Sequence, residues 1–273
     1  MNRPQYVSDA IETTDEGLHV GRYGSFELRS AYQPIYRSEP GGLKLAAFEG
    51  LVRVRRQGAP VPVPEFFTAI EAKDRLFVEC LCRALHLRNY RQAEPTGRDL
   101  FVNVDPSIYE SLAVLEREFG FMLGVLDRYG LDPSRLVCEI VEHEATSEQL
   151  LDLRAMMLGM GIRVAMDDFG AGSSGIARYH ELRPDVVKVD GALFRRLSGD
   201  ALRQKLLRAM ARTLLLQGSE LLVEGIETDD QLAVALSMGA KLFQGYGMAR
   251  PAELPASFAT RITVQQQEQT LRA

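Results

Sequence analysis

Short apolar runs alternate with longer amphipathic runs through most of the chain, and this alternation predicts a parallel α/β fold. Five of the apolar runs are four to seven residues long, and each leads into a segment with helical spacing. Buried parallel strands have this character because helices cover both faces of their sheet. The strands are predicted at 100–103, 136–141, 162–168, 186–190 and 221–224, and the helical segments at 105–129, 147–158, 174–179, 193–216 and 229–238.

The number of strand–helix units in 273 residues favours a closed (β/α) barrel over an open sheet. Residues 46–54 are predicted to form a further strand, and residues 28–35 a non-standard first strand. The chain is expected to divide into a polar N-terminal arm or linker remnant (1–24), one barrel domain (25–262) and a polar C-terminal tail (263–273).

Composition excludes several classes of protein. The formal net charge of −5 gives no basic footprint for a nucleic-acid duplex. Three cysteines make no disulfide framework and fit a reducing cytoplasm. Cys80 and Cys82 fall two apart in a predicted helix over 75–90, where they would point to different faces and make no metal pair. Neither a membrane span nor a signal peptide is predicted.

A polar side chain closes nearly every predicted strand. The carboxyl ends of barrel strands converge on one mouth, where active sites lie. Any one of these residues could be a helix cap or a surface charge, but their repetition at consecutive strands favours a shared site. They are Glu49, Asn103, Glu139, Asp167, Asp168, Lys188 and Glu224.

The carboxylates in this set predict a metal site. Packed carboxylates repel one another unless they are protonated or neutralised by a cation. Hard oxygen ligands suit Mg²⁺, Mn²⁺ or Ca²⁺, and a shared carboxylate with a second beside it suits two ions that serve phosphodiester hydrolysis. Asp167 and Asp168 are the expected bridge, and Lys188 would hold a water molecule or a phosphate oxygen.

A glycine-rich stretch supplies a rival interpretation. Residues 170–175 match the GxGxxG pattern, and Asp190 follows about twenty residues on, as in nicotinamide- or flavin-dependent oxidoreductases. The stretch lies mid-chain, however, and Asp167 and Asp168 directly before it would repel a pyrophosphate. A flexible loop over the barrel mouth is the favoured interpretation.

The sequence leaves the role of Arg53 open. Depending on a bulge, it lies on the same face of its strand as Glu49 or on the opposite one, as a phosphate clamp or an exterior salt bridge. The histidines show no metal-ligand spacing and are assigned no chemistry; they are His19, His86, His143 and His180.

From about Leu28 to about Pro255 the chain resembles the EAL-domain cyclic di-GMP phosphodiesterases. Eight motifs come in the order of that family, which makes the resemblance specific. They lie at 32–35, 48–53, 103–105, 139–142, 167–170, 188–190, 224–227 and 243–246.

The resemblance implies a fold, an activity and partners. The fold would be a TIM-like (β/α)8 barrel with an irregular, partly antiparallel strand arrangement. The activity would be hydrolysis of cyclic di-GMP to linear pGpG with two Mg²⁺ or Mn²⁺ ions, and Ca²⁺ would inhibit it. A homodimer is expected, and the resemblance allows for an upstream sensory or regulatory domain or protein.

The resemblance also implies roles for single residues. Glu49, Asn103, Glu139 and Asp167 match the ligands of one metal ion, and Asp167, Asp168 and Glu224 match those of the other. Lys188, Glu224 and Glu49 are the expected catalytic residues, with Lys188 beside the attacking water. The substrate side would consist of Gln33, Leu51, Arg53 and Gln244, with Gln244 just behind the metal ligands. Glu142 would hold the loop after Asp168 and couple it to dimerisation.

The chain departs from the family pattern beside the site but at none of the metal ligands. The signature reads Glu-Gly-Leu in place of Glu-Ala-Leu. The departures are Gly50, Val54, Asp105, Val141, Ser173 and Gly175. The alternative function is therefore a weak or inactive cyclic di-GMP receptor or interaction module.

Overall fold

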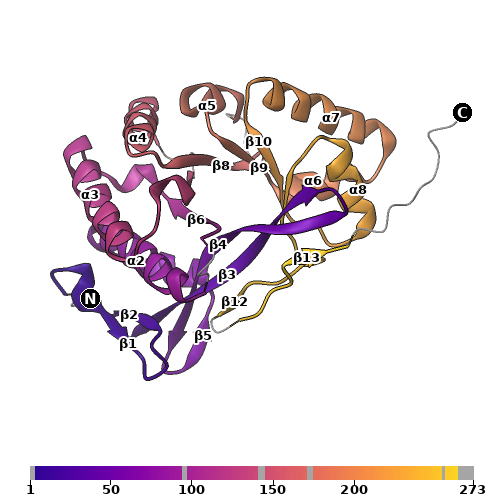
Figure 1. Cartoon of the computed structure of the whole chain (residues 1–273). Helices are drawn as coiled ribbons and strands as arrows, with labels where there is room; N and C mark the ends of the chain where they lie inside the picture. The colour runs from indigo at the N-terminus through magenta and orange to yellow at the C-terminus, as the bar shows by residue number, and fades with distance from the viewer. Residues whose placement is uncertain (1–3, 94–96, 141–144, 171–174, 254–255, 264–273) are drawn as a thin grey trace, which may run out of the picture.

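An eight-stranded barrel forms the centre of the molecule (Figure 1). The computed structural model describes residues 4–93, 97–140, 145–170, 175–253 and 256–263. The ring runs in the order β3, β11, β10, β9, β8, β7, β6, β4 and closes by pairing β4 with β3. The bounds are β3 (Phe26–Glu39), β4 (Gly42–Arg56), β6 (Asp99–Val104), β7 (Leu136–Ile140), β8 (Arg163–Phe169), β9 (Val186–Val189), β10 (Glu220–Val223) and β11 (Leu242–Phe243).

Strand β3 runs against both of its neighbours, β4 and β11, whereas all other neighbouring pairs in the ring are parallel. Only Pro40 and Gly41 connect β3 to β4, and a connection this short makes these two strands antiparallel. Because β4 is parallel to the rest of the ring, β3 also runs against β11. Gly41 and Gly42 have positive φ, 87° and 141°, which residues with a side chain rarely adopt. The predicted TIM-like barrel with a partly antiparallel strand arrangement is confirmed.

Helices cover the outside of the barrel, as the amphipathic runs predict. Their bounds are α1 (Val63–Ala69), α2 (Arg75–Ala93), α3 (Leu112–Arg128), α4 (Ser147–Gly159), α5 (Gly175–Leu182), α6 (Gly191–Ser198), α7 (Ala201–Leu216) and α8 (Asp229–Ser237). The run 193–216 is two helices, because the Asp200 carboxylate accepts from the backbone N–H of Leu202 and Arg203 and starts α7. Within the described ranges, no helix has the length and apolar character that crossing a bilayer requires.

The outer half of the β3–β4 hairpin builds a second core beside the barrel. The 3₁₀ helix η1 (Val7–Ala10) and the strands β1 (Ile11–Thr13), β2 (His19–Tyr23) and β5 (Ala59–Val61) join it. Part of the segment expected as a polar arm is therefore ordered here, with Ala10, Val20 and Tyr23 buried. The strands β1 and β5 bury no residue fully, and β2 buries only Val20, Gly21 and Tyr23, so the apolar pattern of this segment is weak in the sequence.

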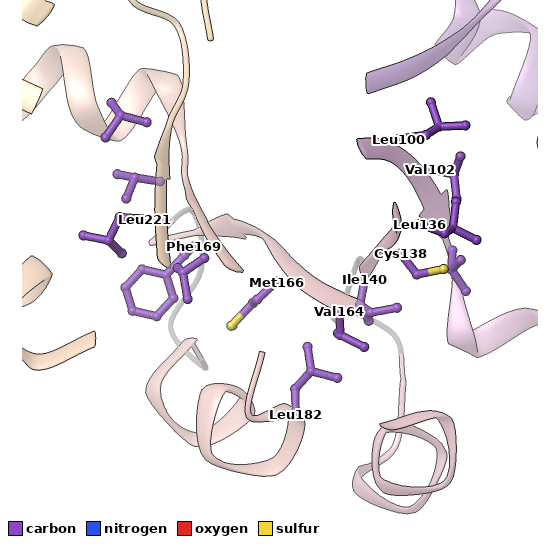
Figure 2. Packing of buried hydrophobic residues seen from close by; sticks show 14 of the residues in the cluster. Leu100, Val102, Leu136, Cys138, Ile140, Val164, Met166, Phe169, Leu182 and Leu221 are labelled. Atoms are coloured by element: carbon purple, nitrogen blue, oxygen red, sulfur yellow. The ribbon is translucent and has the colours of Figure 1, made fainter. Parts of the chain in front are cut away.

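Alternate residues of the parallel strands pack against the helices. Figure 2 shows Val164 and Met166 of β8 on the side of Leu182 from α5. The residues between them point into the barrel and form a separate apolar layer with one member from each of the eight strands. This inner layer consists of Ile35, Ala47, Phe101, Val137, Ala165, Val186, Leu222 and Leu242.

Candidate active site

On every strand of the barrel, the polar residue of the mouth is the next residue on the same face as the inner-layer residue, in the direction of the mouth. On the seven parallel strands the polar residue comes two positions after the inner-layer residue, and on β3, which runs the other way, two positions before it. Since side chains alternate along a strand, both residues of each pair face the barrel axis. The pairs are Ala47–Glu49, Phe101–Asn103, Val137–Glu139, Ala165–Asp167, Val186–Lys188, Leu222–Glu224, Leu242–Gln244 and Ile35–Gln33.

The ammonium group of Lys188 lies at the centre of this ring. Its Nζ is 2.6 Å from Glu139 Oε1, 2.8 Å from Glu224 Oε1, 3.0 Å from Asp167 Oδ1 and 3.7 Å from Glu49 Oε1. The side chain is only 1% exposed. Burial opposes its charge, but the surrounding carboxylates outweigh burial and raise its pKa well above the usual value. Lys188 is therefore a fixed positive charge inside a ring of acids.

Glu139 is the most deeply buried acid of the ring, with no exposed surface. Burial, together with the charge of Glu49, raises its pKa well above the ordinary value, against the opposing effect of Lys188. Its Oε2 has no hydrogen-bond partner among the described residues. A buried carboxylate oxygen without a donor is costly, so this position favours a bound cation.

Asp167, Asp168 and Glu224 come together beside Lys188. Each has a carboxylate oxygen within 4.8 Å of the others. Two consecutive aspartates reach the same mouth because β8 changes register between Met166 and Phe169, and Asp168 has a φ of +52°. A left-handed aspartate is sparsely populated, and such strain is typical of functional sites. Burial raises the pKa of Glu224 to about 7, although Lys188 opposes the shift.

Glu49 and Asn103 are positioned by their neighbours. Gln244 Nε2 donates a buried hydrogen bond of 2.6 Å to Glu49 Oε2. The next residue, Gly245, packs against the backbone of Ile226 so closely that a Cβ there would collide with it. Asn103 lies on β6 directly beside Glu139 of β7 in the parallel register.

The outer part of β4 continues the face that carries Glu49. Its pairing with β3 is regular from residue 47 to residue 56, so Glu49, Leu51 and Arg53 share one face. This settles the position of Arg53 beside the mouth; its Nη1 donates to Val52 O at 3.0 Å. Gln33 lies opposite Glu49 across the hairpin, and its Nε2 donates to Ala249 O at 3.4 Å.

Some residues of the motifs have structural contacts in place of contacts at the mouth. Asp190 accepts from Leu193 N at 2.7 Å and caps α6, and Asp105 accepts from Ser107 N at 2.9 Å. Glu142 and Ser173 lie outside the described residues. The glycine stretch follows β8 of a closed barrel and not the first strand of an open sheet, which argues against the dinucleotide interpretation.

His86, to which the sequence assigns no chemistry, lies directly behind the signature strand. It is buried on α2, and its Nδ1 is 2.9 Å from Ser30 Oγ. Its ring packs against Gly50, 36 positions earlier in the chain. No local pattern marks such a contact between a strand and a helix, so periodicity and spacing could not have predicted it.

Two curated relatives are similar to this chain over most of its length. The cyclic di-GMP phosphodiesterase RocR of Pseudomonas aeruginosa is 29% identical over 257 residues, which are 90% of this chain and 60% of RocR. The probable cyclic di-GMP phosphodiesterase PdeA of Escherichia coli is 26% identical over 229 residues, 81% of this chain and 30% of PdeA. The chain thus spans less than two thirds of the length of these relatives.

Solved structures show the same architecture. BlrP1 of Klebsiella pneumoniae, in a complex with manganese and cyclic di-GMP, has a TM-score of 0.72 and 29% identity, covering 82% of this chain and 56% of that one. YkuI of Bacillus subtilis, with cyclic di-GMP and calcium, has a TM-score of 0.71 and 28% identity, covering 86% of this chain and 57% of that one. Residues 23–251 match the EAL domain family. With that match over most of its length, and with its family motifs gathered at one barrel mouth, the chain belongs to the EAL domain family.

Proposed function

We propose that this chain hydrolyses cyclic di-GMP to linear pGpG with two divalent cations, Mg²⁺ or Mn²⁺. The observation that carries the proposal is the ring of acids around Lys188. Relatives named as cyclic di-GMP phosphodiesterases and neighbours solved with cyclic di-GMP and manganese or calcium support it.

The charge of the ring fits two divalent ions. If all its groups are ionised, five carboxylates and the one ammonium group of Lys188 leave a formal charge of −4, which two divalent cations would neutralise. The carboxylates are those of Glu49, Glu139, Asp167, Asp168 and Glu224. Hard oxygen ligands of this kind suit Mg²⁺ and Mn²⁺.

The ligands divide into two overlapping sets. Glu49, Asn103, Glu139 and Asp167 would hold one ion, and Asp167, Asp168 and Glu224 the other. Ions bound there would activate a water and offset the charge that develops on the phosphate. The oxygen of Glu139 that lacks a hydrogen-bond partner among the described residues fits such a role.

The remaining residues would position the reactants. Lys188 directs its ammonium group toward the centre of the ring, where it would orient the attacking water and neutralise one carboxylate. Gln244 fixes Glu49 through their 2.6 Å hydrogen bond. Arg53 would bind a phosphate of the substrate, with Gln33 and Leu51 on the adjoining surface. Glu142 is proposed to hold the loop after Asp168 and to couple it to a homodimer.

Three of the departures from the family pattern, Gly50, Val54 and Asp105, lie away from the proposed substrate face, whereas Val141 and Ser173 are outside the described residues. Gly50 and Val54 lie on the face of β4 opposite Glu49 and Arg53, where Gly50 meets His86 and Val54 packs in the second core. Asp105 caps a 3₁₀ turn. These positions therefore favour an active enzyme over a receptor that binds cyclic di-GMP without turnover.

The test is a hydrolysis assay on the purified chain with Mg²⁺, Mn²⁺ and Ca²⁺, with pGpG identified as the product. Turnover is expected with Mg²⁺ or Mn²⁺ and little with Ca²⁺. Glu49→Gln and Lys188→Met should each abolish it, whereas the exposed controls Glu65→Gln and Lys205→Met should not. Tight binding of cyclic di-GMP with no turnover under any metal would establish the receptor function instead.

A further inference from the structure

A second concave site lies on the outside of the barrel, between the N-terminal residues, α2 and α3. It is a cavity of about 550 Å³, which is within the range of small-molecule sites. Figure 1 shows the N-terminal segment beside α2 and α3. None of the residues of the barrel mouth lines this cavity. A ligand here would therefore be distinct from the proposed substrate.

The polar lining of this cavity is mainly cationic. Arg83 and Arg88 reach it from α2, Arg117 reaches it from α3, and Lys73 lies at one end. Glu118 is the single carboxylate among the lining residues. Arg117 forms an ion pair with Glu118 at 3.0 Å, and Lys73 forms one with Glu71 at 2.8 Å. Arg83 is paired with Glu79, so among the described residues Arg88 is the lining cation without an ion pair. Its charge favours an anion at this end of the cavity.

Arg88, which lines the cavity, has a side-chain nitrogen, Nε, with no acceptor among the described residues. Within the described ranges, buried side-chain polar atoms without a hydrogen-bond partner occur in only two places: acid oxygens at the barrel mouth, and Arg83 Nη1 and Arg88 Nε at this cavity. Arg83 is 5% exposed; its Nη2 donates to Tyr109 at 2.8 Å, and its Nη1 forms an ion pair of 3.5 Å with Glu79, so the donor available to a ligand is that of Arg88. Just as acid oxygens without donors favour a cation, arginine donors without acceptors favour an anion.

The rest of the lining is largely apolar. Leu76 and Phe77 of α2 face Met122 and Val125 of α3 across the cavity, and Phe121 at its edge is 64% exposed. A large exposed aromatic beside buried cations fits a ligand that has both an apolar body and a negative group. We propose that this cavity binds a small organic carboxylate with an acyl or aromatic body.

Isothermal titration calorimetry of the whole chain tests the proposal with decanoate and naphthalene-2-carboxylate as probes. At least one carboxylate should bind with 1:1 stoichiometry, while decyltrimethylammonium should not bind at this site. Arg88→Met should weaken binding about tenfold or more, because it removes a charged donor at similar volume. The matched control is Arg91→Met, the same change on the same helix outside the cavity.

A second variant tests the proposal independently of Arg88→Met, in case that variant does not fold. Ala84→Phe fills the cavity from α2 without changing charge and should also abolish binding, with thermal unfolding checked for each variant. Absence of binding for both carboxylates would overturn the proposal. So would equal affinities in Arg88→Met and Arg91→Met. Because the readout is binding and not hydrolysis, the outcome is independent of the proposed phosphodiesterase activity.

Discussion

The imidazole of His86 lies directly against the α-carbon of Gly50. A methyl group at residue 50 would be 3.0 Å from His86 Cγ and 3.2 Å from its Cβ and Cδ2. The ring has little freedom to move, because its Nδ1 is 2.9 Å from Ser30 Oγ and its backbone carbonyl accepts from Tyr32 at 2.7 Å. The glycine of the signature motif and the histidine of α2 are therefore complementary in shape.

Gly50→Ala should destabilise the chain by about 1–3 kcal/mol, because it overpacks this contact. Replacing His86 by alanine should relieve the overpacking, so the two changes should couple by about 1 kcal/mol or more in a double-mutant cycle. Urea denaturation of the four proteins measures the coupling. Strictly additive effects would show that the ring yields without cost.

His86 should make stability depend on pH. Burial first, and then the charge of Arg53, lowers its pKa from 6.5 to about 3. Below pH 6.5 the unfolded chain binds a proton that the folded chain does not, so acid favours unfolding by about 1.4 kcal/mol per pH unit down to about pH 3. The stability of the wild type relative to His86→Gln should therefore decrease as the pH is lowered from 7 to 5. A difference independent of pH would mean that His86 titrates normally.

Lys188→Met should destabilise the metal-free chain strongly, by about 3–5 kcal/mol, because it leaves buried acids without their cation. Mn²⁺ should restore part of this loss, so the rise in melting temperature on adding Mn²⁺ should be larger in the variant than in the wild type. The exposed control Lys205→Met should behave as the wild type. If Mn²⁺ raised the melting temperature of neither protein, the ring would not be a metal site.

Gln244→Leu should weaken Mn²⁺ binding about 10- to 100-fold, the range expected when a metal ligand loses the group that orients it. The change removes the donor that holds Glu49 at 2.6 Å. Calorimetric titration with Mn²⁺ measures the effect, with the exposed Gln217→Leu as the matched control. Unchanged affinity would show that Glu49 needs no support from Gln244.

Periodicity was sufficient to predict seven of the eight barrel strands and most of the mouth, but not the two-residue strand β11 that precedes Gln244. Each parallel strand shows an apolar residue and, two positions later, a polar one, as in Val137 and Glu139 or Leu222 and Glu224. A period of two places both on one face, and parallel strands bring such faces together. The gathering of these residues is therefore a consequence of local patterns.

Contacts between distant segments could not be predicted in this way. The register change that turns Asp168 into the mouth depends on the pairing of β8 with β9, and the contact of Gly50 with His86 depends on how α2 packs. The cavity outside the barrel likewise needs η1, α2 and α3 in place together. Such features depend on tertiary packing, which overrides local propensity.

The β3–β4 hairpin is one continuous ladder that belongs to two cores. Within β4, Ala47 packs in the barrel interior and Val54 in the second core, so Glu49 and Arg53, four residues apart, are anchored to different bodies. A tilt of the second core would displace Arg53 while the acids stay in place. A change in the packing of η1 or α2 would then alter the contact of Arg53 with the proposed substrate without moving the proposed metal ligands.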